Sequence, residues 1–267
     1  MKLFSLLLCL PVFALSFFAP KNVYAQKVII ESYPAYNCNI VMKNEENLSD
    51  ILESNKDVFL LTCPIDDELL DDNVAKEECI LRKHRYLTNH PYTYTSFPTV
   101  AVNGRYIMSS YFTNIVNSGV KLAHSEKQLG QITISYEDNN LRAHMPDIGT
   151  YQAYDLWIFA YSRERQGVIA LRTQATHDNS EHEHDEDGNH IDPALDVDPS
   201  GRMSQDISFK NVVKTLKKLG QWDGRAENIV IPLHDFKADG FAIAAQEKNT
   251  GPIAAFGYFE LSGQKNH

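Results

Sequence analysis

The first half of the chain mixes short apolar runs with apolar residues at helical spacing. Residues 27–30 and 58–62 are apolar and rich in β-branched side chains, which predicts two buried strands. After the first run, Leu48, Ile51 and Leu52 are spaced for one face of a helix. After the second run, a long charged segment contains Val74, Ile80, Leu81 and Tyr86, which predicts a partly exposed helix.

A hairpin and a last helix close this half. The apolar runs 99–102 and 106–108 flank Asn103-Gly104, and because both turn residues tolerate positive φ, the pair predicts a hairpin. Apolar residues then repeat at helical spacing over 112–123. Strand, helix, strand, helix, hairpin and helix is the order of a thioredoxin-like α/β domain, although other topologies share it.

From about Leu129 the pattern changes to short strands separated by turn residues. One helix is predicted among them, because one helical face would carry Phe209, Val212, Val213, Leu216 and Leu219. We therefore expect an α/β thioredoxin-like domain over residues 26–125, followed by a smaller β-rich, sandwich-like domain over residues 126–267.

The N-terminal stretch has the features of a signal peptide. Met1-Lys2 precedes an apolar run from Leu3 to Ala19, and Val23-Tyr24-Ala25 places small residues where a signal peptidase reads them. The run is shorter than the roughly 20 apolar residues of a membrane helix. We expect residues 1–25 to be removed, no membrane span to be left, and the protein to be periplasmic or secreted.

Charge is concentrated in one segment. The chain has 35 acidic and 25 basic residues, a formal net charge of -10, which argues against a nucleic-acid partner. Nine of the acidic residues lie between His177 and Asp198, where there is no Lys or Arg. This segment contains few apolar residues, and the surface they could bury would not offset the entropy of ordering the backbone. We therefore expect a disordered insertion at about residues 177–200.

Several blocks of the chain form a recognisable set of motifs: Pro98 to Gly104, Phe209-Lys210-Asn211-Val212-Val213, Leu216, Leu219-Gly220, Trp222-Asp223-Gly224 and Gly251-Pro252-Ile253. As a set they resemble an exported bacterial family called domain of unknown function 1223, which carries a thioredoxin-like domain and a smaller β-rich one. The resemblance covers most of the mature chain and implies a fold more than an activity.

The chain departs from this family after the first strand, where the family usually has Cys-x-x-Cys. An ungapped count places Ala35 at the first cysteine and Cys38 at the second, whereas the other register places Cys38 first and Val41 second. Neither register holds two thiols. Thiol-disulfide exchange needs one thiolate to attack and another to resolve the mixed disulfide, so the redox motif is degenerate.

The mature chain holds Cys38, Cys63 and Cys79, which allow at most one internal disulfide. A Cys38–Cys63 bridge fits the predicted topology, but the sequence leaves the pairing open. Cys38 has two interpretations. It is a reactive thiolate near a helix N-terminus beside Pro98, or a buried remnant that packs as a small apolar side chain, and we prefer the second.

The leading functional hypothesis is an exported, redox-degenerate protein that binds a peptide or protein partner and is not an enzyme. Aromatic side chains expected in loops near Pro98 either line a groove for that partner or cover the domain edge, and for any one of them we prefer the second: Tyr33, Tyr36, Tyr92, Tyr94 and Phe97. The alternative is a thiol-disulfide oxidoreductase that uses Cys38 alone or with Cys63, which makes Cys38, Cys63 and Pro98 its candidate catalytic residues.

A second alternative is metal binding by the acidic insertion. Imidazole and carboxylate ligands suit zinc, copper or nickel, and the insertion contains His177, His182, His184 and His190. A specific site needs ligands held in a fixed geometry, and almost nothing apolar is present to fix this backbone. We therefore expect a mobile loop and no cofactor.

Overall fold

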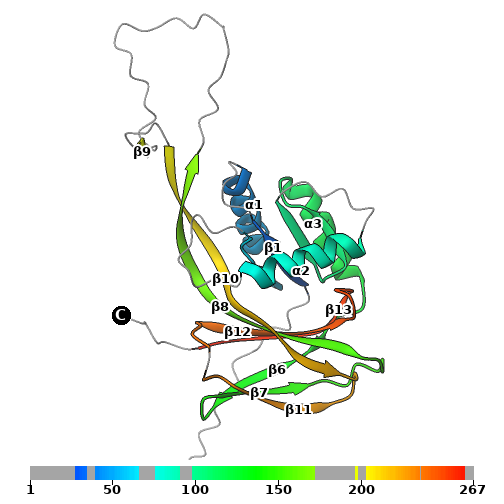
Figure 1. The fold of residues 1–267 in the computed structure, drawn as a ribbon. Coiled ribbons are helices and arrows are strands. Elements are labelled where there is room, and N and C mark those ends of the chain that lie inside the picture. Colours follow the sequence, from blue (N-terminus) through cyan, green and yellow to red (C-terminus); the bar gives the residue numbers. More distant parts are fainter. Residues whose placement is uncertain are drawn as a thin grey trace, which may run out of the picture.

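The computed structural model describes residues 28–34, 40–65, 76–90, 98–171, 196–197, 203–234 and 236–261. Three helices lie beside a large mixed sheet, and a second, three-stranded sheet packs on the other side of its lower part (Figure 1). None of the described helices is long and apolar enough to cross a membrane.

The elements predicted for the first half are present. They are β1 (Val28–Tyr33), α1 (Ile40–Ser54), β2 (Val58–Thr62), α2 (Lys76–Asn89), β3 (Thr99–Val102), β4 (Tyr106–Ser109) and α3 (Thr113–Ser125). β1 runs parallel to β2 and antiparallel to β3. Asn103 and Gly104 have φ of 48° and 64°, as the predicted hairpin turn requires.

The elements that the structure describes in the second half are strands. They are β5 (Gly130–Gln131), β6 (Thr133–Glu137), β7 (Asn140–Met145), β8 (Tyr154–Leu171), β9 (Asp196–Val197), β10 (Met203–Trp222), β11 (Glu227–Pro232), β12 (Gly240–Glu247) and β13 (Ile253–Glu260). β8 and β10 form a long antiparallel ribbon that extends past the helices (Figure 1). The small sheet has the order β11-β7-β6.

The predicted fold class, a thioredoxin-like α/β domain followed by a β-rich domain, is wrong. Strands of both halves belong to one ten-stranded mixed sheet in the order β4-β3-β1-β2-β10-β8-β12-β13-β5, with β9 beside β10. β2 joins the halves, because Thr62 pairs with Val212 and Asn211 Nδ2 donates to Leu60 O at 2.8 Å. Strand pairing between distant segments therefore decides the architecture, and local patterns do not reveal it.

The helix predicted over residues 209–219 is also wrong, because this segment lies within β10. Its pairing with β8 shifts register between Val213 and Thr215 and again between Lys218 and Gly220. A bulge inserts one residue and so breaks the two-residue alternation of a strand. Buried positions then fall three residues apart, at Val213 and Leu216, which imitates helical spacing.

Apolar side chains fill both faces of the large sheet. α1 and α3 cover one face of its first half through Leu48, Ile51, Val116 and Val120. α2 covers the opposite face, in a core that also takes Phe59, Phe159 and Phe256 and that we call the α2 core. The sandwich core lies between the two sheets and contains Leu141, Ile158, Trp222, Phe241 and Ile243.

Candidate functional site

The ends of β1 and β2 and the start of β3 meet at one edge of the large sheet. Cys63, directly after β2, donates its N–H to Ser32 O at 2.7 Å, and Tyr33 pairs with Thr99 across β1 and β3. Pro98 is buried directly before β3, and its carbonyl accepts the N–H of Ser110 at 3.0 Å. The structure thus brings Cys63 and Pro98 to this edge, while Cys38 lies outside the described residues.

Cys63 is bonded to Cys79, with a Cα–Cα distance of 5.5 Å. This confirms that the protein holds a disulfide and assigns the pair that the sequence left open, so Cys63 is not paired with Cys38. Cys63 and Cys79 are only 1% and 0% exposed. The face of α2 that carries Cys79 turns inward, and the bridge holds α2 against the end of β2.

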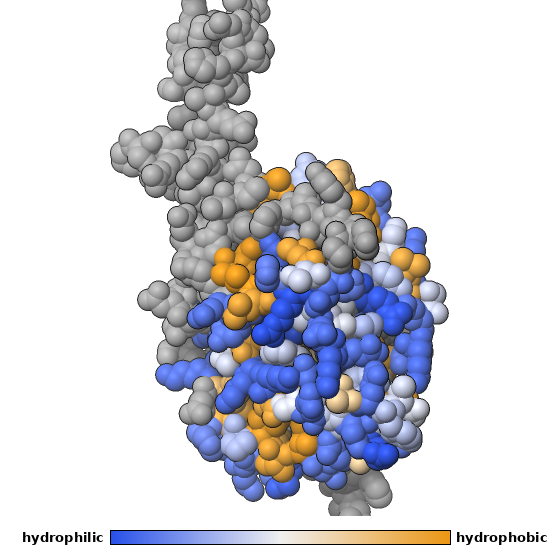
Figure 2. Space-filling view, turned by 45° about the vertical axis from the view of Figure 1, so that its right-hand side comes forward, coloured by the Kyte–Doolittle hydropathy of each residue, from blue (hydrophilic) through white to orange (hydrophobic). Residues whose placement is uncertain are grey.

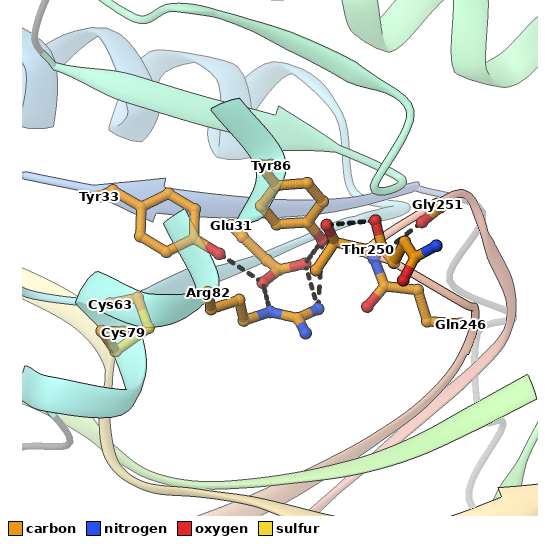
Figure 3. A network of polar contacts seen from close by, with 10 residues as sticks. Glu31, Tyr33, Cys63, Cys79, Arg82, Tyr86, Gln246, Thr250 and Gly251 are labelled. Atoms are coloured by element: carbon orange, nitrogen blue, oxygen red, sulfur yellow. Dashed lines mark hydrogen bonds and ion pairs between the residues drawn. A yellow bond between two sulfur atoms is a disulfide. The ribbon is translucent and has the colours of Figure 1, made fainter. Parts of the chain in front are cut away.

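A buried polar network lies beside the disulfide, with the Glu31 carboxylate at its centre (Figure 3). Arg82 donates from Nε at 2.5 Å and from Nη2 at 2.9 Å, which makes a bidentate pair. The hydroxyls of Tyr86 and Tyr33 donate to the same carboxylate at 2.7 and 2.8 Å. A carboxylate inside the sheet is thereby compensated by one cation and two phenols.

Residues of the second half complete the network. Gln246 on β12 donates from Nε2 to the Tyr86 hydroxyl and to Gly251 O, each at 2.8 Å. The Arg82 guanidinium lies 5.1 and 5.2 Å from the ring centroids of Trp157 and Phe159 on β8, close enough for cation–π attraction. Because of these contacts, α2 is anchored to both halves of the chain through one charged side chain.

The charges of the network support one another. Burial alone would raise the pKa of Glu31, but the Arg82 guanidinium and the hydrogen bonds from Arg82, Tyr86 and Tyr33 outweigh it and lower that pKa. Burial likewise opposes the charged form of Arg82, and the Glu31 carboxylate raises its pKa above the ordinary value. Burial, with Glu31 nearby, raises the pKa of Tyr33, so this phenol stays protonated.

This network is closed to solvent, because Glu31, Arg82 and Gln246 are each at most 1% exposed. Arg82 Nη1 and Gln246 Oε1 have no hydrogen-bond partner in the described part of the chain. No substrate can approach such a centre without α2 moving aside. Its role in this structure is to position α2, and it does not provide a catalytic group at the surface.

The network was not predicted from the sequence, although two signals point to it. The charged Glu31 directly follows the apolar residues 28–30 of β1, and Cys79, Arg82 and Tyr86 fall three and four residues apart on α2. Apolarity instead suggested that Ile80 and Leu81 face the core, and both are exposed. A helix whose buried face carries Arg and Tyr cannot be oriented by hydrophobicity alone.

The predicted aromatic groove is wrong for Tyr33, which is fully buried in the network; Tyr36, Tyr92, Tyr94 and Phe97 lie outside the described residues. The metal candidates His177, His182, His184 and His190 lie outside them too. Within the described residues, no group of three or more His, Cys, Asp or Glu side chains is placed to hold a metal ion. Metal binding by the insertion therefore stays a prediction.

Comparison with known proteins informs the fold alone. No family model matches the chain, and no curated protein matches it. A crystal structure of the protein AGR_C_4864 from Agrobacterium tumefaciens, a structural genomics target, is similar over 91% of this chain and 97% of its own. The TM-score is 0.62 and the identity 16%. The family resemblance found in the sequence stays a prediction.

Proposed function

We propose that the protein is exported and binds a peptide or protein partner without running a redox cycle of its own. The observation that carries the proposal is an exposed apolar surface of Tyr111, Phe112 and Ile115, which we call the Phe112 surface. Export is supported by the apolar N-terminal run and by a disulfide, which is compatible with an oxidising compartment.

The Phe112 surface lies beside the sheet edge that carries Cys63 and Pro98, since the N–H of Ser110, the residue before Tyr111, donates to Pro98 O. Its side chains are 39%, 53% and 39% exposed, and the rings of Tyr111 and Phe112 are in edge-to-face contact with centroids 4.7 Å apart. Single exposed apolar residues are common, but contiguous ones mark binding surfaces. Figure 2 shows that the hydrophobic patches on the visible face are separated by hydrophilic surface.

The backbone under this surface is held in place. Buried Asn47 on α1 donates from Nδ2 to Ser110 O at 3.2 Å and to Tyr111 O at 2.8 Å, and Tyr111 N donates to Ser109 Oγ at 3.3 Å. A surface that is ordered before binding loses little conformational entropy when a partner docks. The geometry therefore favours recognition of an apolar segment over chemistry at this edge.

The test is selection of peptides on the disulfide-intact mature protein. Peptides from a random displayed library should be enriched in apolar and aromatic residues, and Phe112→Ser should weaken their binding at least about tenfold, as expected for a central aromatic anchor. Val230→Ser is the matched control, because Val230 is 55% exposed on the distant small sheet. Equal binding by wild type and Phe112→Ser would reject the proposal.

Export is tested separately. We expect the mature protein to begin at Gln26 and to be recovered from the periplasm or the medium, which N-terminal sequencing measures. An intact Met1 on a membrane-integrated product would contradict this.

A thiol-disulfide oxidoreductase is the second candidate, because the Cys63–Cys79 bridge lies at the edge where β1 leads toward Cys38. Turnover would need an external dithiol to reduce the bridge to two thiols, which then re-form the bridge as they reduce a substrate disulfide. The burial of both cysteines opposes this. Insulin reduction by wild type that is lost in Cys63→Ser would favour the enzyme over our proposal.

A further inference from the structure

A cavity of about 510 Å³ lies at the opposite end of β3 from Pro98. Its walls come from four segments: the turn after β3, the connector between α3 and β5, the loop after β7, and the turn between β12 and β13. The cavity therefore lies where the two halves of the chain meet. Its size falls within the range of small-molecule sites, which occur preferentially at such junctions.

Hydrogen bonds form this junction in advance of any ligand. Asn103 accepts the N–H of Ile29 on its side-chain Oδ1 at 2.8 Å and the N–H of Ile253 on its carbonyl at 2.9 Å. Gly104 follows with φ of 64°, and a Cβ there would lie 2.8 Å from both Gln246 Nε2 and Gly251 O. The turn after β3 is thus fixed against β12 and β13, so the cavity is a lasting feature of the fold.

The lining is apolar at its base and charged at its rim. Leu129, Ile148, Tyr154 and Ile253 supply the apolar part. At the rim, Arg105 Nη1 and Glu126 Oε1 form an ion pair at 2.9 Å, and Lys127 Nζ donates a hydrogen bond to Ile148 O at 2.9 Å.

Two further rim carboxylates are uncompensated. Asp147 accepts only the Gly149 N–H and the Tyr151 hydroxyl, and neither Asp147 nor half-buried Glu247 has an ion-pair partner within the described chain. Asp147 is exposed, whereas Glu247 is partly desolvated, and a partly desolvated carboxylate without a cation loses hydration that nothing replaces. Against the cations Arg105 and Lys127, the carboxylates Glu126, Asp147 and Glu247 leave the rim one negative charge in excess, next to an apolar base.

We propose that this cavity binds an alkylammonium group, with the carbon chain on the apolar base and the ammonium at the Glu247 and Asp147 carboxylates. A free amine and a lysine side chain of a peptide offer the same chemistry. The site is separate from the Phe112 surface, which lies toward the other end of β3, so either proposal can fail without the other.

The test is isothermal titration of the mature, disulfide-intact protein with three probes of equal chain length: hexylamine, hexanol and hexanoate. Hexylamine should bind with one-to-one stoichiometry and at least about tenfold more tightly than the neutral and the anionic probe. Methyl signals of Leu129, Ile148 and Ile253 should shift during the same titration. Absence of saturable amine binding, or equal binding of hexanol, would overturn the proposal.

Variants locate the site. Glu247→Gln should weaken hexylamine binding about tenfold, and Ala254→Phe should abolish it by filling the cavity while the melting temperature is kept. Glu53→Gln is the matched control, because Glu53 is an exposed carboxylate on α1. Binding that resists both cavity variants, or falls equally in the control, would reject the site.

The source of the ammonium is decided by a second pair of probes. Tighter binding of Nα-acetyl-lysine methylamide than of hexylamine would indicate a lysine side chain of a peptide, and the reverse would indicate a small amine. Either preference supports the site only if Glu247→Gln weakens both probes. If Glu247→Gln leaves the two affinities unchanged, the assignment is wrong.

Discussion

The sandwich core and the α2 core lie on opposite faces of the large sheet and are stabilised in different ways. The sandwich core is apolar, with Ile158, Phe241 and Ile243 fully or almost fully buried among similar side chains. The α2 core contains a carboxylate, a guanidinium, two phenols and an amide in hydrogen-bonded contact beside a disulfide. When an apolar side chain is shortened, the loss in the free energy of unfolding depends on the size of the group removed. When one member of a charged network is removed, the remaining buried charges are left uncompensated.

The largest expected effect comes from removing one charge of the α2 core. Arg82→Met leaves Glu31 buried without its cation and should lower the free energy of unfolding by about 3–5 kcal/mol, measured by chemical denaturation. The double variant Glu31→Leu/Arg82→Met should recover most of this loss, because no charge is then left unpaired.

The control is Arg142→Met, which breaks an exposed ion pair with Glu137 at 2.6 Å and should cost less than about 1 kcal/mol. If the double variant is no more stable than Arg82→Met, the difference between the two cores does not arise from charge compensation.

Among changes measured at a single pH, removal of the covalent link should have the next largest effect. The Cys63–Cys79 bridge closes a loop with a sequence separation of 16, and its loss in Cys63→Ser/Cys79→Ser should cost about 3 kcal/mol through the greater entropy of the unfolded chain. Thermal unfolding with and without dithiothreitol measures the same quantity in the wild type. An unchanged melting temperature under reducing conditions would show that the network alone holds α2.

A third test compares two buried glutamates. Glu45 on α1 has no cation beside it within the described part of the chain, so burial, opposed only by a hydrogen bond from Asn44, raises its pKa to about 8. Its stabilising contribution is fully present below the ordinary pKa of 4.5 and is lost as pH rises through about 8. Between pH 5 and 9 the wild type should lose on the order of 4 kcal/mol that Glu45→Gln keeps.

Glu31 has the opposite dependence. Its lowered pKa means that its contribution is present above the ordinary value and is lost as pH falls through the folded-state value. Parallel pH profiles of wild type and Glu45→Gln between pH 5 and 8 would contradict the assignment to Glu45.

The smallest effect is expected in the sandwich core. Ile243→Val removes one methylene at a fully buried position and should cost about 1 kcal/mol, with an unchanged dependence on denaturant. A loss as large as that of Arg82→Met would remove the contrast between the cores.

Local signals predicted much of the first half and little of the candidate site. The Asn103-Gly104 hairpin, β1 and β2 follow from φ preferences and apolar runs that act within a few residues. The helix expected over residues 209–219 failed because the bulges of β10 depend on pairing with β8. The partner of Cys63 and the inward face of α2 were equally hidden, since each depends on segments distant in the chain.

By itself, the amino-acid sequence determined where most strands and the three helices of the first half lie, how the charge is distributed, and that one disulfide at most forms within the mature chain. Those properties depend on backbone preferences and on counts of residues. Only the tertiary structure decided that β2 and β10 merge two predicted domains into one sheet, that Glu31 meets Arg82, and that Cys63 bonds Cys79. These contacts release their free energy only once distant segments have been brought together, so no local window of the sequence contains them.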